Sequence, residues 1–298
     1  MKIMMTGVGG MLGEAFYEVF SDEGHELHCS DINTSEKWIS YLDFRNFSEY
    51  LNLSNSVRPD VLLHIGAHTG LEYCEDQIRD AYLTNTLSVE NAVVIANSLD
   101  IPILYISTAG IFDGQKSVYD DWDVPNPLGV YARTKYLGER YVVENARRYF
   151  VCRAGWMMGG GPNKDKKFVN KIMKQIQQGQ KILYVVDDKD GTPTYTIDFA
   201  ANCAALLDTE YYGLYNMVCE GLTSRYEVAT ELLQHVGLKD TIELVKVSSQ
   251  HFEKTYFAPR PACERLINKK LELRSLNLMR DWKTCLKEYL DSRYDNFL

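Results

Sequence analysis

The chain has 298 residues, of which 45% are hydrophobic and 24% charged, and its formal net charge is −9. This composition is typical of a globular protein with a large core and excludes the disordered and fibrous classes. The negative charge argues against nucleic acid as a partner, because binding a phosphate backbone needs a basic face. No apolar run is long enough to cross a membrane, so a membrane partner is not expected.

The start of the chain and its cysteines predict a cytoplasmic protein. The opening MKIMMTG contains too few apolar residues for the core of a signal peptide. The seven cysteines are scattered without a CxxC pair, so they are expected to be reduced and mostly buried. No metal ligands are assigned, and Glu14 and the acids at 187, 188 and 190 are only weak candidates. The basic segment 163–174 is either a solvated helix face or part of a pocket for a phosphorylated ligand.

The first half of the chain alternates short apolar runs with longer amphipathic stretches. Strands are predicted at 2–6, 25–29, 60–66, 101–107 and 149–155, and helices at 11–21, 47–57, 76–98 and 131–148. Prolines at 59 and 102 mark the entries to two of these strands, because proline cannot continue the preceding helix. The alternation predicts an α/β fold of the Rossmann type, a doubly wound parallel sheet with helices on both faces.

The rhythm is less regular after residue 155. Helices are predicted at about 166–178, 196–208, 224–236 and 279–291, and strands at 182–186, 215–219 and 242–247. We therefore expect a dinucleotide-binding domain over 1–155, rejoined by parts of 190–220. Residues 156–298 would form mainly a smaller C-terminal α/β lobe that binds the substrate.

A glycine-rich turn between the first strand and the first helix predicts a nucleotide site. Gly7, Gly10 and Gly13 allow a tight turn and let a pyrophosphate approach the helix N-terminus, although a plain turn is the alternative. Asp31 closes the second strand, where an acid can accept hydrogen bonds from ribose hydroxyls, or can cap a turn. An acid at this position favours NAD(H), while NADP(H) remains allowed because Lys37 could reach a 2′-phosphate.

Tyr131 and Lys135 form the candidate catalytic pair. Their spacing of four residues at the start of a helix puts both on one face. A free phenol has a pKa of about 10, so a nearby ammonium is needed to make Tyr131 a useful acid. Thr108 at the mouth of the fourth strand can hydrogen-bond the substrate oxygen, and Ser107 competes for that role. The alternative is an exposed Tyr and Lys at helical spacing.

Beyond these motifs, several longer segments follow one another as they do in a known family. "DVLLHIGAHT" (60–69), "NPLGVYARTKYLGE" (126–139), "GTPTYTIDFA" (191–200) and "APRPACERL" (258–266) resemble the dTDP-4-dehydrorhamnose reductase family of extended short-chain dehydrogenases/reductases. The likeness runs nearly end to end. It implies an oxidoreductase that uses NAD(P)H to reduce the 4-keto group of a nucleotide-activated deoxysugar, in nucleotide-sugar and cell-surface polysaccharide biosynthesis.

The resemblance also implies roles for individual residues. Near the cofactor it places Gly10, Met11 and Leu12 at the pyrophosphate, Asp31, Asp43 and Phe44 around the adenosine, and Gly66, Ala67 and His68 beneath it, with Tyr131 and Lys135 also in contact. Near the nucleotide-sugar it places Thr108, Ala109, Trp156 and Arg260. Three of these have plain alternatives: Asp43 could cap a helix, Trp156 could belong to the core, and Arg260 could be a surface charge.

Residues 109 and 110 depart from the resemblance. The family usually continues Ser-Thr with Asp-Tyr, whereas this chain has Ala109-Gly110. The missing side chains would border the sugar, so a reshaped substrate pocket is expected. The absence of an acid pair argues against a dehydratase. A nucleotide-sugar C4 epimerase and a non-catalytic NAD(P)-binding regulatory subunit stay open, and a homodimer formed through helices 76–98 and 131–148 is a further expectation.

Overall fold

A seven-stranded parallel sheet is the centre of the computed structural model, which describes residues 1–295 and 297. Its spatial order is β11-β6-β5-β4-β1-β2-β3. The strands are β1 (Lys2–Thr6), β2 (Glu26–Asp31), β3 (Ile39–Tyr41), β4 (Val61–His64), β5 (Ile103–Thr108), β6 (Tyr149–Ala154) and β11 (Gly213–Asn216). The chain winds outward in one direction through β2 and β3 and in the other through β4, β5 and β6, so a crevice opens between β1 and β4.

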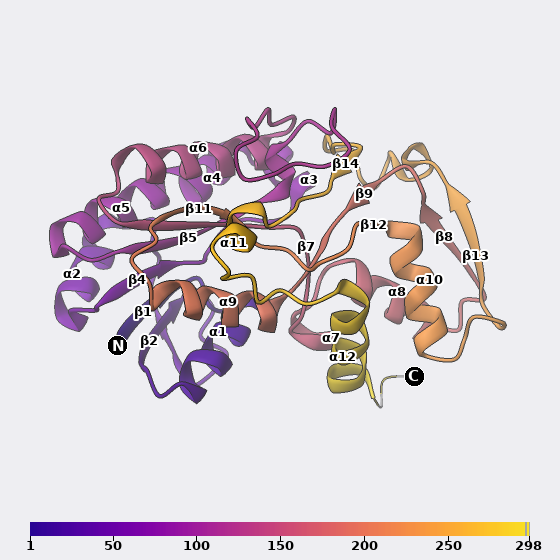
Figure 1. The fold of residues 1–298 in the computed structure, drawn as a ribbon, viewed down its shortest axis with the longest axis horizontal. Helices are drawn as coiled ribbons and strands as arrows, with labels where there is room; N and C mark the ends of the chain where they lie inside the picture. The colour runs from indigo at the N-terminus through magenta and orange to yellow at the C-terminus, as the bar shows by residue number, and fades with distance from the viewer. Residues whose placement is uncertain (296, 298) are drawn as a thin grey trace.

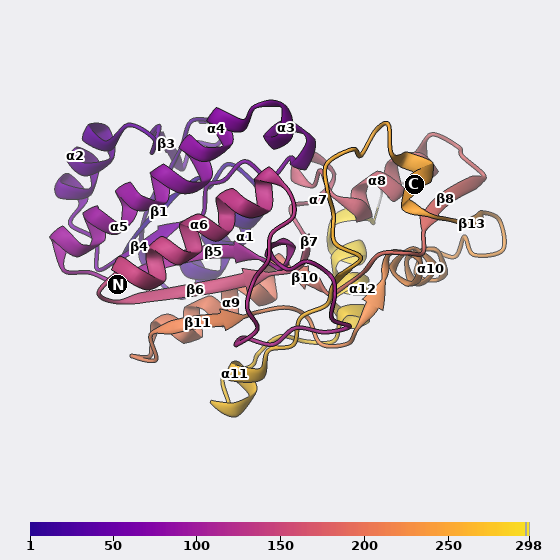
Figure 2. The same ribbon diagram turned by 90° about the horizontal axis from the view of Figure 1, so that it is seen from above.

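Helices cover both faces of this sheet (Figures 1 and 2). α1 (Met11–Asp22) and α9 (Thr196–Leu207) pack together on one face, and α2 (Phe47–Val57), α5 (Ser88–Leu99) and α6 (Val130–Asn145) cover the other. Successive side chains of a strand point to opposite faces, so Ile3 and Met5 enter one core cluster and Met4 enters the other. The predicted α/β fold of the Rossmann type is confirmed.

The predicted helix 76–98 is instead a series of shorter pieces. α3 (Leu71–Asp76) and α4 (Ile78–Tyr82) lead into a π-helical turn, Leu83–Leu87, and then into α5. Asn85 in that turn is fully buried, and its side chain bonds to the main chain of His68 and to Thr134 instead of facing solvent. Single π-helical turns often occur at functional sites.

The other predicted elements differ from the observed ones mainly at their ends. The strand expected at 215–219 is β11 (Gly213–Asn216), and the helix expected at 279–291 is α12 (Trp282–Tyr294), which begins after Asp281 caps it by accepting the Lys283 and Thr284 N–H groups. β3 was not predicted, because only its first residue is buried and it has no apolar alternation.

The C-terminal lobe consists of small sheets and short helices beside the carboxyl edge of the large sheet (Figure 1). β7 (Trp156–Met158) pairs with β10 (Pro193–Tyr195), β8 (Ile182–Val186) with β13 (Glu243–Val247), and β9 (Asp190–Gly191) lies between β12 (Thr223–Ser224) and β14 (Cys263–Glu264). The helices are α7 (Gly161–Lys164), α8 (Phe168–Gln177), α10 (Arg225–His235), α11 (Lys269–Leu273) and α12. The division of the chain at residue 155 stays a prediction.

Two other sequence expectations concern the cysteines and the membrane. All seven cysteines are free and buried, as expected. Within the described residues, no helix has the length and apolar character needed to cross a membrane.

A buried ion pair fastens α6 to the sheet. Arg153 on β6 and Glu139 on α6 lie 2.6 Å apart, and each side chain is only 3% exposed. Removing one member of such a pair leaves an uncompensated charge in the interior, which is far more costly than losing a surface pair.

We expect Glu139→Gln to lower the free energy of unfolding by about 3–5 kcal/mol, because Arg153 then stays buried without its counter-charge. Urea denaturation measures the change. The matched control is Glu144→Gln on the same helix, where the pair with Arg140 is about half exposed and is worth at most about 0.5 kcal/mol. Equal small losses in the two variants would contradict this account of α6.

Candidate active site

One large cleft runs along the carboxyl edge of the sheet and under the C-terminal lobe. Its volume is about 2030 Å³, whereas sites for a single small ligand usually measure about 300–1,000 Å³. The cleft therefore has room for a dinucleotide and a second nucleotide-sized ligand. The residues assigned to the cofactor and the substrate from the sequence all line this cleft: Gly7, Gly10, Met11, Leu12, Gly13, Asp31, Asp43, Phe44, Gly66, Ala67, His68, Thr108, Ala109, Tyr131, Lys135, Trp156 and Arg260. Lys37, which was expected to be able to reach a 2′-phosphate, does not line it.

The nucleotide end of the cleft depends on a close contact between two loops. Gly7 has a φ of +78°, and a Cβ added there would lie 2.1 Å from the Cα of Gly66. A Cβ on Gly66 would in turn lie 2.3 Å from the Phe44 ring. Any side chain at either glycine would push these loops apart and displace the predicted cofactor residues beside them.

The N-terminus of α1 is open toward this end of the cleft. Gly10 is its N-cap residue, no side chain caps the helix, and a Cβ added to Gly10 would meet nothing within 4 Å. The first turn therefore offers free N–H groups and a partial positive charge, which suit a pyrophosphate. These residues fit a bound dinucleotide.

The acids predicted around the adenosine make local contacts. Asp31 accepts hydrogen bonds from the N–H groups of Gly9 and Asn33, both at 2.8 Å. Asp43 pairs with Arg45 at 2.7 Å, and these hydrogen bonds lower the pKa of the Asp43 carboxyl. Asp43 does not cap α2, since Asn46 does so. Arg45, which the sequence analysis did not single out, also lines the cleft and pairs with Asp80 at 2.9 Å.

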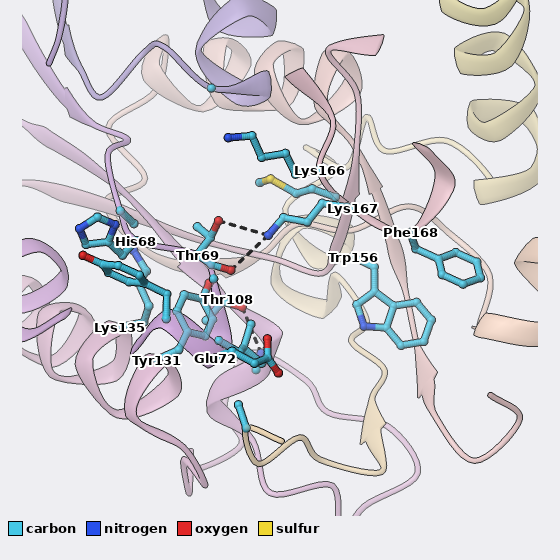
Figure 3. Close-up of a pocket in the computed structure, with 18 of the residues that line it drawn as sticks. His68, Thr69, Glu72, Thr108, Tyr131, Lys135, Trp156, Lys166, Lys167 and Phe168 are labelled. Carbon is cyan, nitrogen blue, oxygen red and sulfur yellow. Dashed lines mark hydrogen bonds between the residues drawn. The ribbon is translucent and has the colours of Figure 1, made fainter. Parts of the chain in front are cut away.

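Thr108, Tyr131 and Lys135 lie together on one wall of the cleft (Figure 3). Thr108 ends β5, and its Oγ1 accepts the Gly110 N–H at 3.1 Å, so that bond does not use its hydroxyl proton, which can be donated to the Tyr131 oxygen or to a ligand. The Lys135 ammonium is buried, donates to the Ile106 carbonyl at 2.7 Å and lies 4.2 Å from the centre of the Tyr105 ring. Ser107, the competing candidate, is buried, and its hydroxyl has no partner among the described residues.

The electrostatics of this wall differ from the sequence expectation. Burial raises the pKa of Tyr131 to about 12, and the group that lowers it is the Thr108 hydroxyl, not the Lys135 ammonium. Burial also lowers the pKa of Lys135 to about 7, against a raising effect of Glu139. Tyr131 is thus held protonated at neutral pH, as a proton donor must be, while Lys135 titrates in the neutral range.

Asn85 lies behind the cleft and supports two of its walls, a role that the sequence analysis missed. Its side chain accepts the His68 N–H at 2.8 Å and donates to the His68 carbonyl at 3.0 Å and to Thr134 Oγ1 at 3.1 Å. It therefore joins the loop predicted beneath the cofactor to the helix that carries Tyr131. An Asn in the middle of a predicted helix is the only signal that could have drawn attention to it.

The opposite wall contains Trp156 and Phe168 (Figure 3). Gly191 lies directly against the Trp156 indole, since a Cβ added there would come within 2.3 Å of two ring carbons. The guanidinium of Arg225 lies 3.6 Å from the centre of the same indole and 5.0 Å from the Phe168 ring. Gly191 and the Arg225 guanidinium are both too close to the ring to lie over the same face, so they cover opposite faces of the indole. Only the edge of the indole is then left to contact a ligand.

Basic side chains from the C-terminal lobe extend into the cleft. Lys164, Lys166, Lys167 and Lys171 of the predicted basic segment all line it. Lys167 reaches across to Thr69, donating to its carbonyl at 3.3 Å and its hydroxyl at 3.2 Å (Figure 3). Arg260 likewise pairs with Glu72 on α3 at 2.6 Å. The segment thus faces a pocket instead of forming only a solvated helix face.

The weak metal candidates do not come together. Glu14 pairs with Lys164 at 2.9 Å and with Arg293 at 3.3 Å. In the part of the chain that the structure describes, His, Cys, Asp and Glu form no group of three or more that could hold an ion.

Comparison with known proteins gives the family. Residues 1–294 match the family described as "RmlD substrate binding domain". The chain belongs to this family. Among its relatives, the spore coat polysaccharide biosynthesis protein SpsK of Bacillus subtilis is 29% identical over 98% of each chain.

Solved structures of similar proteins agree with this family. A dTDP-4-dehydrorhamnose reductase from Clostridium acetobutylicum is 31% identical, with a TM-score of 0.87 over 98% of this chain and 99% of its own. A dTDP-4-dehydrorhamnose reductase from Bacillus anthracis, solved in complex with NADP, is 27% identical with the same TM-score and coverage. The resemblance drawn from the sequence is confirmed.

Two glycines of the RmlD-like nucleotide loop give a direct test of the cofactor end. Gly10→Ala points its methyl group into open space, so we expect the melting temperature to stay unchanged and the affinity for NADPH to fall at least about tenfold, because the methyl group occupies the path of the pyrophosphate. Fluorescence titration of NADPH measures the affinity.

Gly13→Ala is the contrasting variant. Its Cβ would lie 2.2 Å from the Val8 carbonyl oxygen, so we expect this variant to lose stability itself. A Gly10→Ala protein that bound NADPH as tightly as the unmodified protein would refute the placement of the pyrophosphate.

Proposed function

We propose that this protein uses NADPH or NADH to reduce the 4-keto group of a nucleotide-activated deoxysugar, for polysaccharide biosynthesis. The observation that carries the proposal is that Tyr131 and Thr108 present hydroxyl groups on one wall of a cleft whose far end is a dinucleotide loop. The relatives named dTDP-4-dehydrorhamnose reductase, one of them solved with NADP, support the same activity and cofactor.

The residues have distinct tasks in this reaction. The reduced nicotinamide, when bound, supplies the hydride that adds to C4 of the sugar. Thr108 donates a hydrogen bond that orients the carbonyl oxygen, and Tyr131 donates its phenolic proton to that oxygen. The Thr108 hydroxyl also stabilises the resulting phenolate, and Lys135, held in place by the Ile106 carbonyl, binds the nicotinamide ribose through its protonated ammonium. The basic side chains of the lobe, Lys166, Lys171 and Arg260 among them, favour the diphosphate of the substrate.

The alternatives raised by the sequence are not favoured. A regulatory subunit does not need a complete catalytic set, whereas Thr108, Tyr131 and Lys135 all line the cleft. Several relatives and solved structures that cover nearly the whole chain at 26–31% identity are named dTDP-4-dehydrorhamnose reductase, whereas a UDP-glucose 4-epimerase from Thermus thermophilus is only 19% identical. The homodimer and the cytoplasmic location remain predictions from the sequence.

Replacing the phenol tests the proton donor. We expect Tyr131→Phe to lower kcat about 10²- to 10⁴-fold, because positioned proton transfer contributes about that factor, while the affinity for NADPH stays the same. The assay follows NADPH oxidation with 4-keto-6-deoxy sugar nucleotides, and NMR identifies the product. A variant that kept near-normal turnover would eliminate Tyr131 as the acid.

The buried ammonium predicts a pH dependence. Since Lys135 has a pKa of about 7, its proton is present below that pH and lost above it, so we expect kcat/KM to fall as the pH rises through about 7. Lys135→Met should have a low kcat/KM at every pH and should not show the decrease above pH 7. The same decrease in both proteins would show that a group other than Lys135 titrates.

A further inference from the structure

A carboxylate from the C-terminal lobe reaches the wall that carries Tyr131. Glu264 lies at the end of β14, and its Oε2 accepts the indole N–H of Trp156 at 2.7 Å. Its Oε1 accepts no hydrogen bond from any residue that the structure describes. One oxygen thus fixes the carboxylate in place and the other is left with its acceptor capacity unused.

The free oxygen lies in the space that the glycine at 110 leaves bare. A Cβ added to Gly110 would be 3.3 Å from Glu264 Oε1, 3.5 Å from Thr108 Oγ1 and 3.8 Å from Tyr131 Cε1. The carboxylate oxygen and the Thr108 hydroxyl therefore border the same point and are no more than about 7 Å apart. A sugar whose carbonyl oxygen meets Thr108 and Tyr131 must present an adjoining part of its ring to Glu264.

The surroundings keep a carboxylate in this position. The charges of Arg225 and Glu264 attract each other, and the Arg225 guanidinium makes no hydrogen bond or ion pair with any other described residue. Arg225 also covers the face of Trp156 that Gly191 does not, so the indole cannot stack on a sugar. A sugar in the cleft can therefore contact only the edge of the Trp156 indole and the Glu264 carboxylate that is hydrogen-bonded to it.

We propose that Glu264 determines which sugar is reduced, by accepting a hydrogen bond from a hydroxyl group on C3, the ring carbon next to the keto carbon. C3 is singled out by chemistry, because in a 4-keto-6-deoxy sugar the other neighbour of C4 bears only a methyl group and the ring oxygen. A substrate with no donor at C3 would leave Oε1 desolvated and unpaired. The proposal rests on the proposed function, since it concerns the substrate of the same site.

The test compares two dTDP-4-keto-6-deoxy sugars that differ only in having a hydroxyl group or a hydrogen at C3. Glu264→Gln retains an acceptor for the Trp156 N–H but turns the free acceptor into a donor. We expect kcat/KM for the 3-hydroxy sugar to fall about 10- to 100-fold, the contribution of a hydrogen bond to a charged group, and kcat/KM for the 3-deoxy sugar to change little. The ratio of the two values is the readout that a merely structural role would not move.

The control is Glu253→Gln, which removes the same charge from an exposed acid that also lines the cleft. We expect it to leave the ratio unchanged. Equal losses on both sugars in Glu264→Gln, or no loss on either, would overturn the proposal while the proposed reduction stands. If the unmodified protein reduced neither sugar, the proposed function would fail. Calorimetric titration of the two sugar nucleotides would then still test Glu264, and equal affinities would overturn its role.

Discussion

The near contact between the backbones of Gly7 and Gly66 is the constraint on which the site depends. The loops after β1 and β4 leave the sheet at the point where the chain changes its winding direction, and the crevice there is deep only because neither loop has a side chain at the crossing. The Phe44 ring, which follows β3 in the chain, packs against Gly66. The free N-terminus of α1, the acid at the end of β2 and the loop with His68 all take their places from this contact.

The catalytic wall depends on a second, electrostatic constraint. A buried ammonium is costly unless it is paired or hydrogen-bonded, and among the described residues Lys135 donates to the Ile106 carbonyl and lies near the Tyr105 ring, with Glu139 further along the same helix. Its lowered pKa reflects that cost. Glu139 in turn neutralises the buried Arg153, so the ion pair that fixes α6 to β6 also supports the charge beside Tyr131.

Much of the fold and of the cofactor end could be predicted from the sequence because both depend on local patterns. The buried strands are apolar runs, the helices between them are amphipathic, and Gly7 and Gly13 of the first loop stand at positions where backbone approaches backbone. The π-helical turn could not be predicted, because it is maintained by contacts of Asn85 with residues 17 and 49 positions away. Periodicity indicates a helix there and carries no information on such contacts.

The wall of the cleft that contains Trp156 was the least predictable part of the site, because its contacts also join residues that are far apart in the sequence. Trp156 was expected to face the nucleotide-sugar, and its place in the cleft fits that expectation, but Gly191 and Arg225 cover its faces. Arg225 and Glu264 are ordinary charged residues in sequence, 69 and 108 positions after Trp156, and only the folding of β7, α10 and β14 onto one another brings them together. From the sequence we expected the pair Ala109-Gly110 to reshape the substrate pocket, but we did not foresee the carboxylate beside it.

The covered indole has a consequence for how substrate choice can change in this protein. Trp156 contacts Arg225 through its face and Glu264 through its N–H, so a substitution at one of the three alters the surroundings of the other two. The effects of such substitutions are not additive. Transplanting a single residue from a relative with a different substrate would leave an unpaired charge or an exposed ring, and a viable change of substrate requires several of these positions to be exchanged together.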